Sequence, residues 1–362
     1  MQGSIGELTS IKTGKLDANA SVANGRYPFF TCSKETLTID SYSYDCECVL
    51  VAGNGDLNVK YYNGKFDAYQ RTYIIEDASD GKLYMKYLYW FMSSYINELR
   101  KQAIGGVIKY IKLGNLTGAK IQLPSIKKQM EIVNIITKVN NVLCYRESQL
   151  HKLDELIQAR FVEMFGDPAL NPNGWEKVNL GSVCDVRDGT HDSPKYFTEG
   201  YPLVTSKNVT SGRIDFTDCS LICEEDYNKI NERSKVDFGD ILMPMIGTVG
   251  KPVIVDVDAE FAIKNVALIK FYDDSKVINI FVRALLQSDY FDRAVISRIR
   301  GGTQKFIALG DIRKLEICLP PMATQLAFRE FAHQVNKSKV EIQQALEKTQ
   351  LLFDSLMQQY FG

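Results

Sequence analysis

The chain contains the segment GGVIKYIKLG at residues 105–114 and, 196 residues later, the segment GGTQKFIALG at residues 301–310. The correspondence continues without a gap, so that residues 105–166 align with residues 301–362, and 17 of the 62 aligned pairs are identical. Self-similarity at a fixed offset over this length indicates an internal duplication. The chain is therefore expected to fold as two related halves.

Weaker matches extend upstream of this alignment, at offsets that change from 174 to 195. A changing offset indicates that the loops of the two halves differ in length. Each half thus has a first part whose sequence has diverged and a second part, called here the better-kept part, whose sequence is more similar between the halves. The matched residues are Phe66 with Phe261, Ile5-Gly6 with Leu180-Gly181, and Tyr27-Pro28 with Tyr201-Pro202.

The better-kept parts carry apolar residues at the spacing of a coiled-coil seam. Each predicted helix follows a Leu-Pro pair and has about 40 residues, which corresponds to roughly 60 Å. Their order and length favour one antiparallel pair, in which Asn140 and Asn336 could fix the register. The predicted seam residues are Ile136, Leu143, Leu150 and Ile157 in the first helix, and Ile342, Leu346, Phe353 and Leu356 in the second.

An alternative is that the two helices are unrelated and that each packs on its own domain. A helix packed on a globular core usually shows a wider apolar face than the narrow seam seen here. The narrow seam, kept over five heptads, favours the coiled coil.

The divergent first parts have a mixed pattern. Short β-like runs at 48–51 and 240–243 end in glycine turns, and helical stretches are expected at about 82–101 and 276–299. We predict an α+β fold, in which two mixed α/β domains are joined and separated by the two long helices. The predicted divisions are 1–123 for the first domain, 124–165 for its helix, 166–175 for a linker with two prolines and an Asn-Gly, 176–319 for the second domain, and 320–362 for the C-terminal helix.

The composition is that of an ordinary globular protein, with 45% hydrophobic and 24% charged residues in a chain of 362. No stretch approaches the length of a membrane span, and the N-terminus shows no signal-peptide pattern. Eight cysteines without metal-ligand or disulfide spacing predict free thiols in a reducing cytoplasm. The net charge of −1 argues against a protein that binds nucleic acid mainly through a net positive charge.

Catalytic signatures are missing from the sequence. It contains no GxxxxGK[ST], GxSxG or HExxH motif and no tetrapeptide of the type D/N-P-P-Y/F, which amino-methyltransferases use to hold an extruded base. Only three histidines are available for general acid–base chemistry. The sequence therefore favours binding over catalysis.

The entry to each long helix resembles a known family. The chain has LPSIKKQMEI at 123–132 and LPPMATQLAF at 319–328, and it also has YPFFTCS at 27–33 and GKFDAYQR at 64–71. This pattern resembles the specificity subunit of type I restriction–modification systems, with two target-recognition domains and two conserved spacer helices. Many members have Glu before the Gln of the helix entry, where this chain has Lys128 and Thr324.

The resemblance implies a subunit that binds a bipartite, asymmetric site on double-stranded DNA and catalyses nothing itself. It implies that the helices set the spacer and dock two modification subunits, which use S-adenosylmethionine to methylate adenine-N6. Restriction subunits would add translocation and cleavage driven by ATP and Mg. Residues 166–300 hold 16 basic and 21 acidic residues, so the isolated chain is expected to bind DNA weakly.

Polar and basic residues near glycine turns and strand ends are the predicted DNA-binding residues. Four of them have an alternative interpretation without DNA contact. Tyr61 and Tyr62 could be half-buried strand residues, and Lys60 could be a solvated charge. His191 could be a surface residue of a turn. Lys109 and Lys305, each beside a Gly-Gly pair, are predicted to contact phosphate, unless these segments are only hairpin turns. The other candidates are Asn54, Asn58, Lys65, Gln70 and Arg71 in the first domain, and Arg187, Thr190, Ser206, Lys207, Asn208, Thr248, Lys251, Lys264 and Asn265 in the second.

Two rival functions remain open from the sequence. The recognition subunit of a type IIB-like restriction system would have the same architecture. A non-DNA adaptor with two binding modules on a coiled coil is favoured slightly by the acidic second domain.

Overall fold

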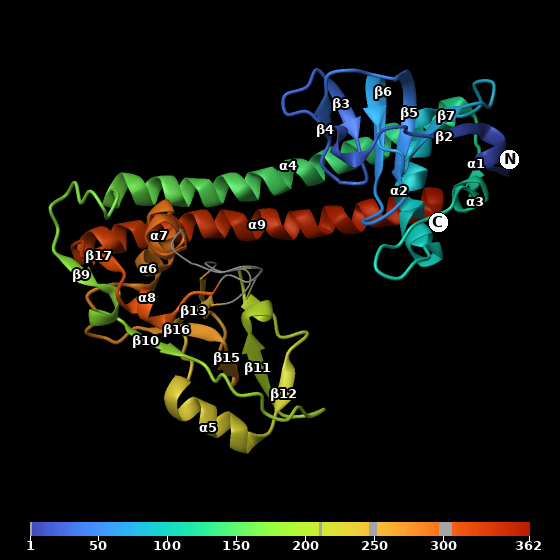
Figure 1. Ribbon diagram of the computed structural model, residues 1–362. Coiled ribbons are helices and arrows are strands. Elements are labelled where there is room, and N and C mark those ends of the chain that lie inside the picture. Colours follow the sequence, from blue (N-terminus) through green and yellow to red (C-terminus); the bar gives the residue numbers. More distant parts are fainter. Residues whose placement is uncertain (1, 210–211, 246–251, 297–305) are drawn as a thin grey trace. The chain divides into compact units, whose positions relative to one another are not determined.

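The computed structural model describes residues 2–209, 212–245, 252–296 and 306–362, and the chain forms two compact units (Figure 1). Unit 1 comprises Met1–Glu147 and Gln344–Gly362, and unit 2 comprises Ser148–Gln343. The two divisions fall at 147/148 and 343/344, positions that the 196-residue offset of the duplication brings into register. Each unit therefore combines one divergent first part with portions of both long helices. The predicted domain boundaries stay predictions.

Unit 1 is built on a six-stranded sheet in the order β2-β7-β5-β6-β3-β4. Along β5 and β7 alternate side chains face opposite sides: Val49, Val51 and Ile75 pack toward helix α2, while Leu50 and Ile74 belong to a separate core on the other face. The elements of this unit are β1 (Gln2–Ser4), α1 (Ile5–Leu8), β2 (Thr9–Thr13), β3 (Tyr27–Phe30), β4 (Leu37–Ile39), β5 (Tyr44–Ala52), β6 (Val59–Ala68), β7 (Thr72–Asp77), α2 (Met85–Gln102), α3 (Leu113–Thr117) and β8 (Lys120–Gln122).

Unit 2 carries sheets ordered β10-β16-β13-β14, β12-β11-β15 and β17-β9. The expected helix at 276–299 is wrong as a continuous element, because it divides into α6 and α7. The Ser288 hydroxyl donates to the Leu285 carbonyl (2.6 Å) at the end of α6, and Ser288 precedes α7. The elements are β9 (Lys177–Asn179), β10 (Asp185–Asp188), β11 (Tyr201–Thr205), η3 (Ser206–Val209), β12 (Ser220–Ile222), α5 (Glu224–Ser234), β13 (Ile241–Pro244), β14 (Val253–Ile254), β15 (Ala262–Lys264), β16 (Val266–Lys270), α6 (Asn279–Leu286), α7 (Asp289–Ala294), α8 (Leu309–Arg313) and β17 (Glu316–Cys318).

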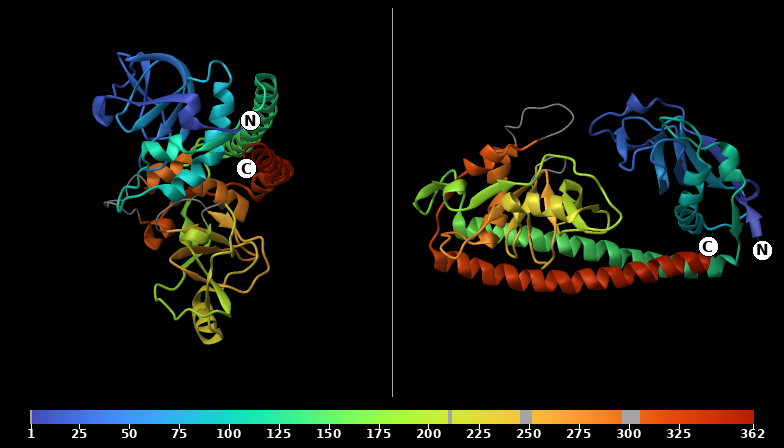
Figure 2. Two further views of the ribbon diagram at one scale, coloured as in Figure 1. Left: turned by 90° about the vertical axis from the view of Figure 1, so that its right-hand side faces the viewer. Right: turned by 90° about the horizontal axis from the view of Figure 1, so that it is seen from below.

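The two long helices are α4 (Ile126–Phe165) and α9 (Met322–Phe361), and Figure 2 shows their ribbons side by side. In unit 1, Arg146 donates to the carbonyl of Ala345. In unit 2, Asp154 pairs with Lys339, and the rings of Phe161 and Phe328 lie 5.7 Å apart. Within unit 2, partner numbers fall along α9 as they rise along α4, which confirms the predicted antiparallel pairing.

The predicted seam residues are buried to different degrees. Three of them are at least 94% buried, namely Ile136, Leu143 and Ile157. The others, Leu150, Ile342, Leu346, Phe353 and Leu356, are half-buried. The heptad pattern thus identified the helix face that packs.

The duplication extends to matching strand pairs. Gly3 pairs with Ile121 in unit 1, and Val178 pairs with Ile317 in unit 2, at offsets of 175 and 196. The parallel pairs β3–β6 and β11–β15 also correspond, because the weak sequence echoes at 174 and 195 bring their registers together. The internal two-fold repeat is therefore confirmed in the divergent parts as well.

One buried glutamine joins each long helix to the domain that precedes it. Gln129 accepts a hydrogen bond from the Tyr84 backbone N–H (2.9 Å) and donates to the carbonyls of Lys82 and Pro124. Gln325 makes the three corresponding bonds, to Ile278 N–H (3.0 Å) and to the carbonyls of Lys276 and Pro320. Both side chains are fully buried. The contact forms in both copies although neither has the preceding glutamate.

Aromatic residues at the helix ends repeat the same arrangement. In unit 1 the rings of Phe361 and Tyr87 lie 5.1 Å apart, and in unit 2 those of Phe165 and Phe281 lie 4.9 Å apart. The last turn of each long helix therefore packs on a helix from the first part of the other half, α2 in unit 1 and α6 in unit 2. All eight cysteines are free. Among the described residues no helix has the length and apolarity needed to cross a membrane.

Candidate nucleic-acid interface

Four loops of unit 1 are joined by hydrogen bonds into what we call the first loop cluster, which consists of residues 31–33, 53–58, 69–71 and 104–110. The Gly53 N–H donates to the Arg71 carbonyl (2.8 Å). The Gly55 N–H donates to the Lys109 carbonyl (2.9 Å), and the Asn58 amide donates to the Cys32 carbonyl (2.8 Å). Of the predicted DNA-binding residues, this cluster brings together Asn54, Asn58, Gln70, Arg71 and Lys109, with Lys60 next to it.

Lys60 and Asn58 hold the first loop cluster together. The Lys60 Nζ atom donates to the Ser33 carbonyl and to Asn58 Oδ1, both at 2.6 Å. Burial lowers the pKa of the Lys60 ammonium group. Lys60 is therefore not a freely solvated surface charge, which was its alternative interpretation. The side chains of Gln70, Arg71 and Lys109 are exposed and available to a ligand.

Three further candidates lie along β6 rather than in the loops. Tyr61 donates to Glu47 Oε1 (2.8 Å), and the Tyr62 ring packs 5.1 Å from that of Phe30. Both tyrosines are half-buried in a strand, as the alternative reading expected. The exposed Lys65 ammonium lies 4.7 Å from the centroid of the Tyr42 ring.

In unit 2 a second loop cluster forms where β10 and β15 end, and we define it by Thr190, His191, Ser206, Lys264 and Asn265. The Asn265 N–H donates to the Thr190 carbonyl (3.2 Å), and the Ser206 hydroxyl donates to the Asn265 carbonyl (3.1 Å). The Lys264 Nζ atom donates to the Ser193 hydroxyl (2.6 Å), so the loop at 190–193 is tied to the end of β15.

His191 lies between two oxygen atoms. Its Nδ1 is 2.7 Å from Asn265 Oδ1, and its Nε2 is 2.9 Å from Asp188 Oδ2. Arg233 pairs with the other carboxylate oxygen of Asp188 (2.8 Å). The hydrogen bonds to Asn265 and Asp188 raise the pKa of His191 above 6.5, because both oxygens accept from the charged imidazolium.

Sequence reasoning missed Asp188 and Arg233 as members of this network. Asp188 stands three residues before His191, a spacing that could have suggested it. Arg233 lies 42 residues after His191 in sequence, in α5, and no local signal connected it to the site.

Three predicted residues of unit 2 are used inside the chain. Arg187 pairs with Asp185 (2.5 Å) and thereby lowers the pKa of that carboxyl group. Lys207 donates to the Asp218 carbonyl (2.9 Å). Asn208 is only 3% exposed, and its amide bonds to Thr205 and to the Asp215 carbonyl. Thr248, Lys251 and Lys305 lie outside the described residues.

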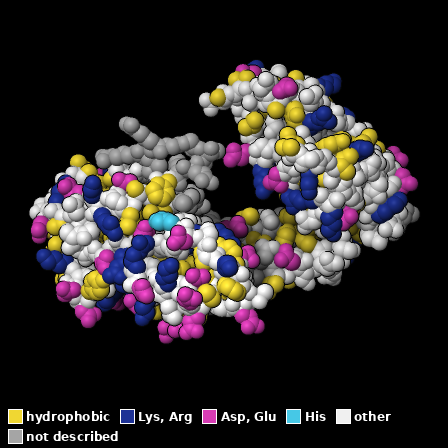
Figure 3. All heavy atoms as spheres, turned by 60° about the horizontal axis from the view of Figure 1, so that its bottom comes forward, with side chains coloured by type: hydrophobic (Ala, Val, Ile, Leu, Met, Phe, Trp, Pro, Cys, Tyr) yellow, Lys and Arg dark blue, Asp and Glu magenta, His cyan; other side chains and the backbone are white. Residues whose placement is uncertain are grey.

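Charges of both signs are mixed on the surface. On the face shown in Figure 3, Lys and Arg side chains are interspersed with Asp and Glu side chains on each unit. Such a surface gives no continuous basic stripe of the kind that holds a phosphate backbone by charge alone.

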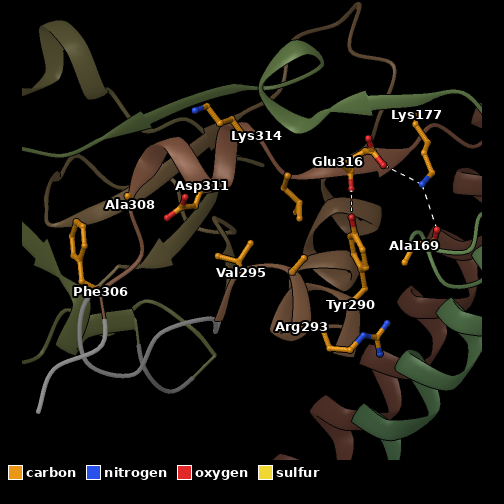
Figure 4. A pocket seen from close by; sticks show the side chains of 12 residues that line it. Ala169, Lys177, Tyr290, Arg293, Val295, Phe306, Ala308, Asp311, Lys314 and Glu316 are labelled. Carbon is orange, nitrogen blue, oxygen red and sulfur yellow. Dashed lines mark hydrogen bonds and ion pairs between the residues drawn. The ribbon is translucent and has the colours of Figure 1, made fainter. Parts of the chain in front are cut away.

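A hollow of about 950 Å³ in unit 2 lies beside α7, α8 and β17 (Figure 4). Lys177 on its wall pairs with Glu316 (3.0 Å), and the Tyr290 hydroxyl donates to the Glu316 carbonyl (2.6 Å). Its basic residues Lys177, Arg293 and Lys314 are accompanied by Asp311 and Glu316. Among the residues that the structure describes, none of the predicted DNA-binding residues lines this hollow.

Comparison with known proteins agrees with this architecture. Residues 1–153 and 172–351 match the family described as type I restriction modification DNA specificity domain. Because the match covers most of the chain, the chain belongs to this family.

Individual relatives carry the same description. The chain is 40% identical over 154 residues to the type I restriction enzyme EcoDI specificity subunit of Escherichia coli, a match that covers 42% of this chain and 33% of that relative. The chain thus spans about a third of the length of that relative. It is 25% identical over 289 residues to the MjaVIII specificity subunit of Methanocaldococcus jannaschii, covering 72% of this chain and 68% of the relative.

Solved structures show the same fold. The S subunit of a type I restriction–modification system from M. genitalium superimposes with a TM-score of 0.60 at 16% identity, over 100% of this chain and 96% of the other. A chain from a structural study of type I complex assembly gives a TM-score of 0.53 at 17% identity, over 100% of this chain and 97% of the other. The α+β architecture with an internal repeat is therefore that of S subunits.

Proposed function

We propose that this chain is the sequence-recognition subunit of a type I restriction–modification complex and binds a bipartite, asymmetric site on duplex DNA. Each loop cluster reads one half-site. The observation that carries the proposal is the pair of dissimilar polar loop clusters on two units whose frames repeat residue by residue. A repeated frame suits the approximate two-fold symmetry of the DNA backbone, and dissimilar loops suit half-sites that differ in sequence.

The catalytic steps belong to partner subunits in this proposal. Two modification subunits would dock on the paired helices and supply S-adenosylmethionine for adenine-N6 methylation. Restriction subunits would supply ATP- and Mg-dependent translocation and cleavage. Family membership favours this assignment over a type IIB-like recognition subunit and over a non-DNA adaptor.

The mixed surface charge bears on affinity. Because residues 166–300 hold more acidic than basic residues and the face in Figure 3 mixes charges of both signs, the partner subunits would supply much of the phosphate clamp. The isolated chain is expected to bind its site weakly at about 0.15 M salt, and the assembled complex tightly. A mobility-shift titration of both would check this, and nanomolar binding by the isolated chain would contradict it.

Methylome sequencing tests the function itself. A host that expresses this chain with its modification subunits is expected to acquire N6-methyladenine in one split motif. A chain lacking residues 176–319 is expected to lose that motif. A methylome that does not change when the chain is expressed would overturn the proposal and favour the adaptor.

A further inference from the structure

The loop at 104–110 of unit 1 is a hairpin whose tip is apolar and exposed. Its base is closed by two hydrogen bonds, from Ile104 N–H to the Tyr110 carbonyl (3.0 Å) and from Tyr110 N–H to the Ile104 carbonyl (2.8 Å). At the tip, Val107 is fully exposed and Ile108 is 62% exposed. Two adjacent branched apolar side chains held in water have no role in the packing of this unit.

The two glycines before the tip differ in whether the fold requires glycine at that position. Gly105 has φ +115°, and a Cβ atom there would lie 2.5 Å from the Ile108 carbonyl oxygen, so the turn itself requires glycine. At Gly106 an added Cβ atom would meet nothing within 4 Å, and its φ lies outside the left-handed region. The fold therefore gives no reason for the second glycine, although both repeats carry the Gly-Gly pair. A reason for glycine at position 106 is that it allows an external ligand to approach the backbone closely.

The hairpin is fixed to the rest of the first loop cluster by backbone hydrogen bonds. The Ile111 N–H donates to the Gly53 carbonyl (2.9 Å), and Gly55 N–H donates to the Lys109 carbonyl (2.9 Å). Asn54, a predicted base reader, forms a β-bridge with Tyr110. Lys109 and Lys112 follow the tip in sequence and are exposed, which suits an anionic ligand. Whatever groove receives Asn54 and Arg71 therefore also receives the hairpin.

We infer that Val107 and Ile108 contact thymine 5-methyl groups in the major groove at or beside the first half-site, with Gly106 allowing the backbone to approach the DNA. This inference rests on the proposed function. The thymine methyl is the apolar group that the major groove displays, and aliphatic side chains recognise it. In the second repeat the residues aligned with Val107 and Ile108 are Thr303 and Gln304, so the pair of branched aliphatic side chains belongs to the first repeat only.

The experiment uses the chain assembled with its modification subunits and duplexes carrying the mapped methylation motif. Each thymine in turn is replaced by deoxyuridine, which lacks only the 5-methyl group. The unaltered complex is expected to lose about fourfold in affinity at one or two thymines of one half-site, the effect of one buried methyl group. The double variant Val107→Ser/Ile108→Ser is expected to bind the natural duplex more weakly and to lose this sensitivity to deoxyuridine. Val22→Ser, at another exposed valine of unit 1, serves as the matched control and should keep it.

Several outcomes would overturn the inference. These are a complex insensitive to deoxyuridine in both half-sites, a motif without thymine at or beside the first half-site, and a double variant that stays as sensitive as the unaltered complex. Failure of the double variant to assemble with modification subunits in the absence of DNA would show that the tip is a protein contact instead. If the unaltered complex binds no duplex specifically, the proposed function itself fails.

Gly106→Ala provides a second measurement that does not depend on the apolar side chains. It is expected to leave thermal unfolding unchanged and to weaken binding of the assembled complex severalfold. Gly105→Ala, in contrast, should destabilise the hairpin. Unchanged DNA affinity in Gly106→Ala would contradict a close approach of the DNA at this position.

Discussion

In unit 1 the buried Gln129 ties the start of α4 to the recognition domain through three hydrogen bonds, and in unit 2 Gln325 makes the same three bonds. The loop clusters share one backbone hydrogen bond, from Gln70 N–H to the Leu16 carbonyl (2.9 Å) in unit 1 and from Asn265 N–H to the Thr190 carbonyl (3.2 Å) in unit 2. Their side-chain networks differ. The first is organised by the half-buried Lys60 and an apolar hairpin, and the second by the His191, Asp188 and Arg233 network. The contacts that maintain the frame were kept after duplication, and the side-chain networks of the loop clusters diverged.

The largest expected effect is on stability, and it differs between the two phenylalanines at the ends of the long helices. Phe165 is only 3% exposed, whereas its counterpart Phe361 is half-buried. Phe165→Ala is expected to lower the local free energy of unfolding of unit 2 by about 3–5 kcal/mol, because it leaves a cavity in a packed core. Phe361→Ala should cost unit 1 less. Hydrogen exchange followed by mass spectrometry measures each unit separately, and a greater loss in Phe361→Ala would contradict the comparison.

The glutamines are expected to behave alike. Gln129→Ala and Gln325→Ala each leave one backbone N–H and two carbonyls without their buried partner, which costs about 2 kcal/mol. The same exchange measurement should show similar losses in unit 1 and unit 2. Gln350→Ala, on the exposed surface of α9, is the matched control and should change little. A large effect in one unit alone would break the equivalence of the two frames.

The paired lysines test whether the shared Gly-Gly segment has a shared role. Lys109→Ala and Lys305→Ala are each expected to weaken binding by the assembled complex about equally for all DNA sequences. Each should reduce the slope of log K against log salt by about 0.9, the contribution of one phosphate contact. Salt titrations of binding measure this. A loss confined to one base position would show instead that the lysine reads sequence.

The smallest expected effect depends on pH and separates the second cluster from the first. Because the folded-state pKa of His191 is raised above 6.5, its favourable charge is fully present below pH 6.5 and is lost as pH rises through the raised pKa. The stability of unit 2 should therefore fall modestly as pH rises through that range, and His191→Gln should remove the dependence. NMR titration of His191 in Asp188→Asn should give a lower pKa. An unchanged pKa in that variant would contradict the assigned hydrogen bond.

The frame was predictable from the sequence because it is repetitive and periodic. The 196-residue offset located both long helices, and the faint echoes of Tyr27-Pro28 and Phe66 marked strands that pair in both units. The break between α6 and α7 was missed, although Ser288 followed by Asp289 is a sequence signal for the start of a new helix.

The candidate site was predictable only in part. Loop residues such as Arg71 and Asn265 could be identified because they stand at turns or strand ends. The buried amide of Asn208 and the distant partner Arg233 could not, since burial and pairing of these residues arise from contacts between segments far apart in the chain. Side-chain type alone gave no means to separate residues that support a loop from residues that face a ligand.

The central claim is that two dissimilar loop clusters each read one half of a split site. It is tested most directly by mapping N6-methyladenine in hosts that express the modification subunits with Asn54→Ala/Arg71→Ala or with Lys264→Ala/Asn265→Ala. The account predicts that the first pair relaxes or abolishes specificity in one half of the motif only, and that the second pair does so in the other half. If either pair altered both halves together, or if both pairs altered the same half, the claim would be contradicted.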